Sequence, residues 1–147
     1  METITDSITV IPSDFATGVE IRGVDLSHPI DETTFRTIED TFNKHGVIYF
    51  RGQNLAPKQQ LALPAASATS NRICTGILGM PDEEALPLLS ELARHGVKPE
   101  FQYRHKWQVG DVLMWNNCTV QHMARKDYDL PLRRLMHRTA TQSSAPF

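Results

Sequence analysis

The sequence predicts an α+β fold, in which several short strands combine with two or three amphipathic helices. Two observations lead to this prediction. Short runs rich in β-branched and aromatic residues are bounded by turn residues, which is the pattern of strands between turns. Phe35, Ile38 and Phe42 recur at a spacing that places them on one face of a helix. The 147 residues fit a single domain with a modest core, and 40% hydrophobic and 22% charged residues are ordinary for a globular protein.

The N-terminal part of the chain carries regular patterns. A helix is expected over Glu32–Lys44, because Asp31 is a favourable N-cap and Gly46 a favourable stop. Pro57 is suited to open a second helix. Strands are expected over Ile8–Ile11, Val19–Val24 and Val47–Phe50. These elements would form one edge of a sheet together with a covering helix.

Residues 63–70 interrupt the pattern with small residues that have no periodicity, so we interpret them as a junction or linker. A later helix is expected just after Pro81, where three acidic residues favour the first turn. Its apolar face would use Leu86, Leu89 and either Leu88 or Leu92. Beyond this helix, Glu100–Trp107 alternates like a strand. We expect it to pair with a buried strand over Val112–Trp115 through the turn that contains Gly110.

The C-terminal part carries the candidate functional residues. His122 lies at a polar tip after the strand Val112–Trp115, and a further strand is expected over Arg133–Thr139. Alternation in that strand places Arg134, Met136 and Arg138 on one face and Arg133, Leu135 and His137 on the other. Two guanidinium groups on one face suit a carboxylate, sulfonate or phosphate. The alternative is an exposed edge strand with solvated arginines, with His122 as an ordinary loop residue.

The spacing Trp115-x-Asn117, four residues, His122, then Arg134 and Arg138, resembles the signature of the taurine dioxygenase (TauD/TfdA) family of Fe(II) and 2-oxoglutarate dependent dioxygenases. The resemblance implies that His122 is the last iron ligand. It also implies that Arg134 holds the distal carboxylate of 2-oxoglutarate and that Arg138 faces the cosubstrate or an anionic substrate. Two positions depart from the usual pattern. Asn116 stands where the family usually has Asp, and Cys118 where it usually has Arg.

The family fold is a double-stranded β-helix, or jelly roll, so the resemblance implies an incomplete jelly roll that lacks its central strands. Residues 1–62 resemble the N-terminal part of the dioxygenase domain and residues 71–147 its C-terminal part, joined at residues 63–70. The family supplies its other two iron ligands from a His-x-Asp or His-x-Glu pair. None of the six histidines is followed two residues later by an acid. Missing strands would leave edges that invite association, so a homo-oligomer is one expectation.

Two functions remain open at this level. One is a dioxygenase that acts on a small, anionic organic substrate with Fe(II) and 2-oxoglutarate. The other is an inactive remnant, or a mis-joined gene product, without the His-x-Asp ligands. A net charge of −2 gives no reason to expect nucleic acid, and no apolar run is long enough to cross a bilayer. Without a secretory signal pattern, we expect a cytoplasmic protein.

Overall fold

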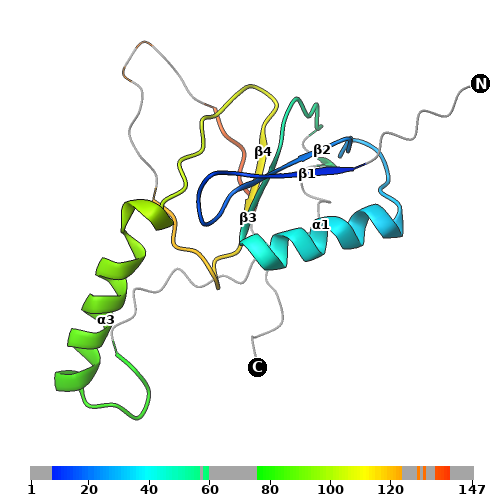
Figure 1. Ribbon diagram of the computed structural model, residues 1–147. Coiled ribbons are helices and arrows are strands. Elements are labelled where there is room, and N and C mark those ends of the chain that lie inside the picture. Colours follow the sequence, from blue (N-terminus) through cyan, green and yellow to red (C-terminus); the bar gives the residue numbers. More distant parts are fainter. Residues whose placement is uncertain are drawn as a thin grey trace, which may run out of the picture.

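A computed structural model describes residues 8–56, 58–59, 76–123, 129, 131 and 135–139. Its centre is a four-stranded sheet with the strand order β1-β2-β3-β4 (Figure 1). The strands are β1 (Thr9–Pro12), β2 (Val19–Arg22), β3 (Val47–Phe50) and β4 (Val112–Trp115). All four predicted strands that build this sheet are confirmed, with small differences at their ends. The helix predicted at Pro57 is described only at Lys58 and Gln59, which are helical; the predicted junction over residues 63–70 lies outside the described residues.

The sheet brings together segments that are far apart in the sequence. β1 and β2 form an antiparallel pair, β2 and β3 run parallel, and β3 and β4 are antiparallel. In the β3–β4 pair, Val47 lies opposite Trp115 and Phe50 opposite Val112. Strands from both sides of the predicted junction therefore belong to one sheet.

Helix α1 (Glu32–His45) connects the parallel strands β2 and β3 and lies along the sheet (Figure 1). Its ends are those the sequence predicts. The Asp31 carboxylate accepts a hydrogen bond from the Thr34 backbone N–H at 2.9 Å. At the other end, Gly46 adopts φ +70°, and its N–H donates to the Phe42 carbonyl at 2.8 Å. Both caps satisfy backbone groups that a helix end leaves unpaired.

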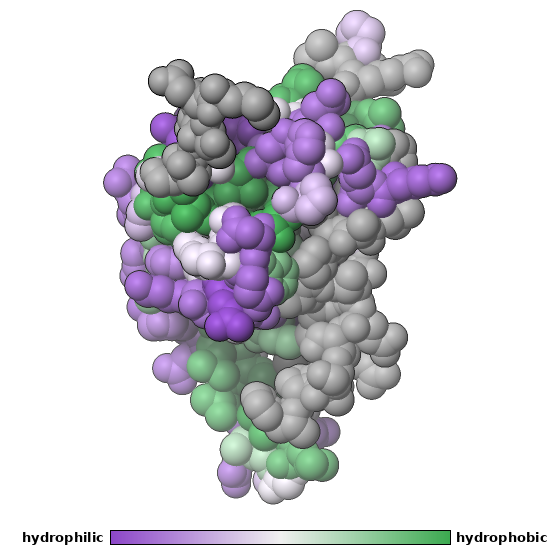
Figure 2. Space-filling model, turned by 90° about the vertical axis from the view of Figure 1, so that its right-hand side faces the viewer, coloured by the Kyte–Doolittle hydropathy of each residue, from purple (hydrophilic) through white to green (hydrophobic). Residues whose placement is uncertain are grey.

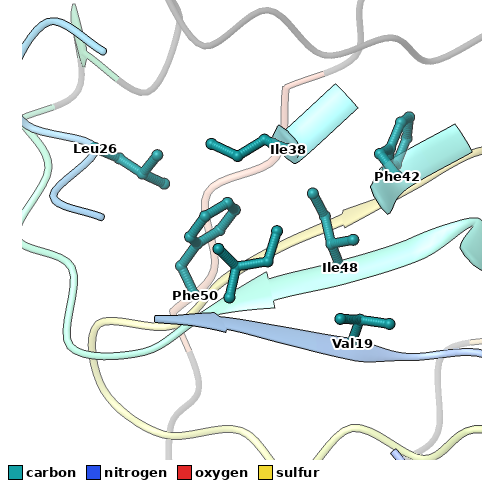
Figure 3. Packing of buried hydrophobic residues seen from close by; sticks show 7 residues of the cluster. Val19, Leu26, Ile38, Phe42, Ile48 and Phe50 are labelled. Atoms are coloured by element: carbon teal, nitrogen blue, oxygen red, sulfur yellow. The ribbon is translucent and has the colours of Figure 1, made fainter. Parts of the chain in front are cut away.

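The hydrophobic core lies between α1 and one face of the sheet. Ile38 and Phe42 of the helix belong to one buried cluster with Ile48 and Phe50 of β3, which are completely buried (Figure 3). The remaining members of this core are Val19, Ile21 and Leu26. Burial of each such side chain stabilises the fold by about 1.5–3 kcal/mol. Since α1 covers this face, the functional residues must be sought elsewhere.

Residues 102–107 lie against the opposite face of the sheet. The Tyr103 ring stacks on Tyr49 of β3 with centroids 6.2 Å apart, and the His105 ring meets Tyr49 edge-on at 4.8 Å. The strand predicted over Glu100–Trp107 is therefore wrong. Pro99–Phe101 forms a 3₁₀ helix (η1). Strand β4 pairs with β3 and not with the segment before Gly110. The alternation in this segment reflects aromatic side chains that pack on the sheet face, not an additional strand.

Helix α3 (Asp82–Gly96) begins after Pro81, as predicted, and extends away from the sheet (Figure 1). Ala85 is buried, but Leu86, Leu88 and Leu92 are exposed. On the face shown in Figure 2, apolar surface occurs in the upper part of the molecule and at its lower end, with hydrophilic residues between. None of the helices among the described residues is long and apolar enough to cross a membrane.

Candidate functional site around Trp115

The candidate site lies where β4 ends, at Trp115. Alternation along the strand places Trp115 on the same face as Leu113 and Asp111, opposite the core face that holds Val112 and Met114. The indole Nε1–H of Trp115 donates to the Asn117 side-chain oxygen at 2.8 Å. This bond fixes the ring at the point where the chain leaves the sheet.

A tight turn over residues 116–120 follows the strand. The Asn116 N–H donates to the Gly46 carbonyl at 2.8 Å, which anchors the start of the turn. The Asn116 carbonyl accepts from the N–H groups of Thr119 and Val120, which closes the turn. The Asn116 side-chain oxygen accepts from the Cys118 N–H at 2.9 Å. An aspartate at position 116 would use the same oxygen acceptor. The asparagine therefore preserves the turn in spite of its departure from the usual pattern.

Two of the three residues predicted for the site meet at this indole. The His122 ring lies with its centroid 4.8 Å from that of Trp115. The Arg138 guanidinium carbon lies 5.5 Å from the Trp115 ring centroid, within the range of a cation–π contact. Both side chains are exposed. The indole therefore supports an imidazole and a guanidinium that are both exposed to solvent.

The remaining predicted site residue, Arg134, lies outside the described residues. The strand predicted over Arg133–Thr139 is not formed over residues 135–139. Arg138 reaches the site through its contact with Trp115 rather than through a strand ladder. Since Arg134 is outside the described residues, the predicted placement of Arg134 and Arg138 on one face stays a prediction.

The residues that the structure describes do not fit an iron centre. A facial triad needs two imidazoles and one carboxylate at a single point. No group of three His, Cys, Asp or Glu that could hold a metal occurs among the residues that the structure describes. The His122 ring instead lies against the Trp115 indole, which also contacts the guanidinium of Arg138. The positive charge of this neighbour disfavours a metal cation. An anion suits this site better than a cation.

A second polar cluster lies at the other end of β4, on the same face, and sequence reasoning missed it. The Asp111 carboxylate is fully buried and accepts from Arg51 Nη1 at 2.5 Å and from His105 Nε2 at 2.8 Å. The Tyr103 hydroxyl lies 2.9 Å from His105 Nδ1. Burial lowers the pKa of His105 and raises that of Tyr103. No local spacing reveals this cluster, because Arg51 and Asp111 are 60 positions apart.

The comparisons with known proteins point to one family. A family model described as taurine catabolism dioxygenase TauD, TfdA family matches residues 64–140. The chain is 45% identical over 67 residues to an alpha-ketoglutarate-dependent 2,4-dichlorophenoxyacetate dioxygenase of Cupriavidus pinatubonensis, a match that covers 46% of this chain and 23% of the relative. It is 31% identical over 65 residues to the pentalenolactone F synthase of Streptomyces arenae, covering 44% and 21%. The chain thus spans less than a quarter of the length of these curated relatives.

Solved structures show the same fold. The chain matches the structure of AAD-2 in complex with Mn(II) and N-oxalylglycine with a TM-score of 0.63 and 15% identity, covering 76% of this chain and 88% of that one. It matches a taurine dioxygenase from Burkholderia xenovorans with a TM-score of 0.62 and 17% identity, covering 76% and 80%. The described sheet therefore corresponds to part of the jelly roll of these dioxygenases.

Proposed function

Because the chain belongs to the taurine catabolism dioxygenase TauD, TfdA family, whose members depend on Fe(II) and 2-oxoglutarate, we propose that it binds a dicarboxylate of the 2-oxoglutarate class at Trp115. The observation that carries this proposal is the meeting of His122 and Arg138 on one indole. A guanidinium binds a carboxylate through two parallel hydrogen bonds, and a neighbouring imidazole N–H supplies another donor.

Each side chain has a role in this proposal. Arg138 binds one carboxylate of the ligand, and its contact with Trp115 limits the orientations of the guanidinium. His122 donates a hydrogen bond to an oxygen of the same ligand. Arg134, four positions before Arg138 in the sequence, is assigned to the second carboxylate by the family resemblance. The ligand of AAD-2, N-oxalylglycine, is likewise a dicarboxylate, which supports this ligand class.

We further propose that residues 1–62 and 71–147 are two parts of one dioxygenase domain, joined at residues 63–70. The pairing of β3 with β4 supports a single domain, because β3 comes from the first part and β4 from the second. The iron centre of the family is incomplete in this proposal, since the chain offers His122 but no His-x-Asp or His-x-Glu pair. The chain alone is then a dicarboxylate-binding member of the family without the oxidative chemistry.

The second candidate is the complete activity, a dioxygenase that oxidises a small organic anion in the cytoplasm. The name of the Cupriavidus relative supports this substrate class, because 2,4-dichlorophenoxyacetate is a carboxylate. The other ligands would then have to come from a second chain, in a homo-oligomer that also covers the open edges of the sheet. The position of the His122 ring beside Trp115, the last residue of β4, is the observation that favours this candidate.

An anaerobic titration of the purified chain with 2-oxoglutarate and Fe(II) separates the two candidates. Calorimetry reports whether the dicarboxylate binds, and the visible spectrum reports whether it chelates iron. We expect binding of 2-oxoglutarate with or without Fe(II), and no visible charge-transfer band. A band that appears with Fe(II), and that disappears when subunits are separated by dilution, would establish the second candidate. Absence of any 2-oxoglutarate binding by folded protein would contradict both.

A further inference from the structure

The buried cluster around Asp111 contains a histidine that the proposed ligand site does not use. Asp111 Oδ2 accepts from Arg51 Nη1 at 2.5 Å, from His105 Nε2 at 2.8 Å and from the Gln108 backbone N–H at 2.8 Å. The carboxylate is fully buried, and the His105 side chain is only 5% exposed. Three segments, the end of β3, residues 102–108 and the start of β4, therefore meet at one carboxylate.

The hydrogen bonds assign the protons of His105. Its Nε2 faces the Asp111 carboxylate, which only accepts, so Nε2 carries the hydrogen. Its Nδ1 faces the Tyr103 hydroxyl at 2.9 Å. In the neutral imidazole, Nδ1 accepts from this hydroxyl, and every polar atom of the ring is satisfied. A proton added at Nδ1 forces the Tyr103 hydroxyl to change from donor to acceptor.

Burial of the His105 ring opposes this extra proton. The titratable groups that face the ring are Asp111, Arg51, Tyr103 and Tyr49, and Tyr49 in turn hydrogen-bonds Glu20 at 3.4 Å. The single negative charge of Asp111 is already paired with Arg51, so a charged imidazole would add an uncompensated positive charge in a buried place. Burial is the main reason that the pKa of His105 lies below its ordinary value. The hydrogen bond and the charge of Asp111 act in the opposite direction, and repulsion from Arg51 acts together with burial.

Side chains hold residues 103–107 on the sheet. The Tyr103 ring fits against Gly18, where a Cβ atom would clash with the ring, and it packs against Tyr49. His105 adds its bond to Asp111, and Arg51 Nη1 donates to the Lys106 carbonyl at 3.0 Å. Among the described residues, no backbone-to-backbone hydrogen bond joins residues 103–107 to the sheet. Loss of the side-chain contacts would therefore free the segment without breaking a ladder.

We propose that His105 is a proton-controlled latch, whose neutral imidazole docks residues 102–107 on the sheet and whose protonated imidazole releases them. The released segment exposes the histidine to water, where the imidazolium is well solvated. A proton that binds the released state more tightly must shift the equilibrium toward that state. In acid, the segment then leaves the face of the sheet that carries Tyr49, while the core beneath α1 remains folded.

Nuclear magnetic resonance tests the latch in the full chain. The titration would follow the His105 ring signal and, in the same samples, the exchange of the Gln108 amide hydrogen, which is bonded to Asp111. We expect both to change with one midpoint below pH 6.5, while the β2 and β3 amides stay protected. Because one proton is coupled to release, the population of the open form should rise by up to about tenfold for each unit of pH within this window.

Two variants make the test specific. His105→Gln keeps a hydrogen-bonding side chain that cannot be protonated, so we expect its Gln108 exchange to lose this pH dependence. His28→Gln is the control, because His28 is a surface histidine that pairs with Asp25 at 3.0 Å and lies away from the cluster; its profile should match the wild type. Wild-type protein alone also decides the matter if His105→Gln does not fold. The latch is wrong if His105 takes up its proton while Gln108 stays protected, or if the core amides open together with it.

Discussion

The carboxylate of Asp111 lies 2.5 Å from the Arg51 guanidinium, although 60 positions separate the two residues in the sequence. Arg51 follows β3, and Asp111 precedes β4. The pair therefore fixes the relative position of the two strands at one end, while Val47 and Trp115 pair at the other. The ligand site and the buried cluster are thus held by the same two strands.

Removal of the Asp111 charge should destabilise the protein. Asp111→Asn leaves Arg51 without its buried partner, and loss of one member of a buried pair costs about 3–5 kcal/mol. Because the Arg51 side chain is 26% exposed, water can solvate part of its unpaired charge. We therefore expect the free energy of unfolding, measured by urea denaturation, to fall by about 2–3 kcal/mol. The exposed pair of Glu32 and Arg36 is the control, since Glu32→Gln should cost at most about 0.5 kcal/mol. Equal effects for the two variants would contradict the assigned importance of Asp111.

Glycine at position 18 is required by the Tyr103 ring. Gly18 has φ +92°, and a Cβ atom there would lie 2.4 Å from Tyr103 Cδ2. Gly18→Ala should therefore combine backbone strain with a clash and destabilise the protein by about 3 kcal/mol. Gly52 is a matched comparison, with φ +63° and no atom within 4 Å of an added Cβ. Gly52→Ala should cost about 1–2 kcal/mol. Chemical denaturation of both variants measures the difference, and a larger loss at position 52 would refute the close approach of Tyr103.

The stability of the whole protein should also depend on His105. Its folded-state pKa is lowered, so between that value and the ordinary value of about 6.5 the unfolded chain binds more protons than the folded chain. The free energy of unfolding should therefore be highest above pH 6.5 and should fall as the pH is lowered through this window. Urea denaturation at several pH values between 5 and 8 measures the slope for wild type and His105→Gln. The variant should show a smaller slope, and an unchanged slope would assign the dependence to other groups.

Much of the sheet could be predicted because its signals are local. Val47–Phe50 and Val112–Trp115 are compact apolar runs bounded by turns, and the caps at Asp31 and Gly46 act within one helical turn. The segment 100–107 was predicted wrongly, because alternation marks a strand and an aromatic segment lying on a sheet equally well. The Asp111 cluster could not be predicted, since its partners come together only when β3 and β4 pair. The resemblance assigned His122 to iron and Arg138 to the cosubstrate or an anionic substrate, and the described structure places both side chains against Trp115.

Trp115 should matter for ligand binding more than for stability. Trp115→Phe keeps an aromatic ring between His122 and Arg138 but removes the Nε1–H bond to Asn117, so the supporting ring becomes less fixed. We expect the affinity for 2-oxoglutarate to fall by roughly three- to tenfold, which corresponds to about 0.7–1.4 kcal/mol. Trp107→Phe is the control, because Trp107 packs on His105 in the other cluster. Titration calorimetry compares the two variants. A larger loss of affinity for Trp107→Phe would place the ligand elsewhere on the sheet.

Titration calorimetry of 2-oxoglutarate with the wild type, Arg138→Gln and Arg94→Gln tests directly whether a dicarboxylate binds at Trp115. Arg94 is an exposed residue at the end of α3, so it controls for the loss of one positive charge. We expect Arg138→Gln to weaken binding by about tenfold or more and Arg94→Gln to leave it unchanged, because a charge-assisted bond to a carboxylate is lost only in the first variant. Equal affinities for all three proteins would contradict a dicarboxylate site at Trp115.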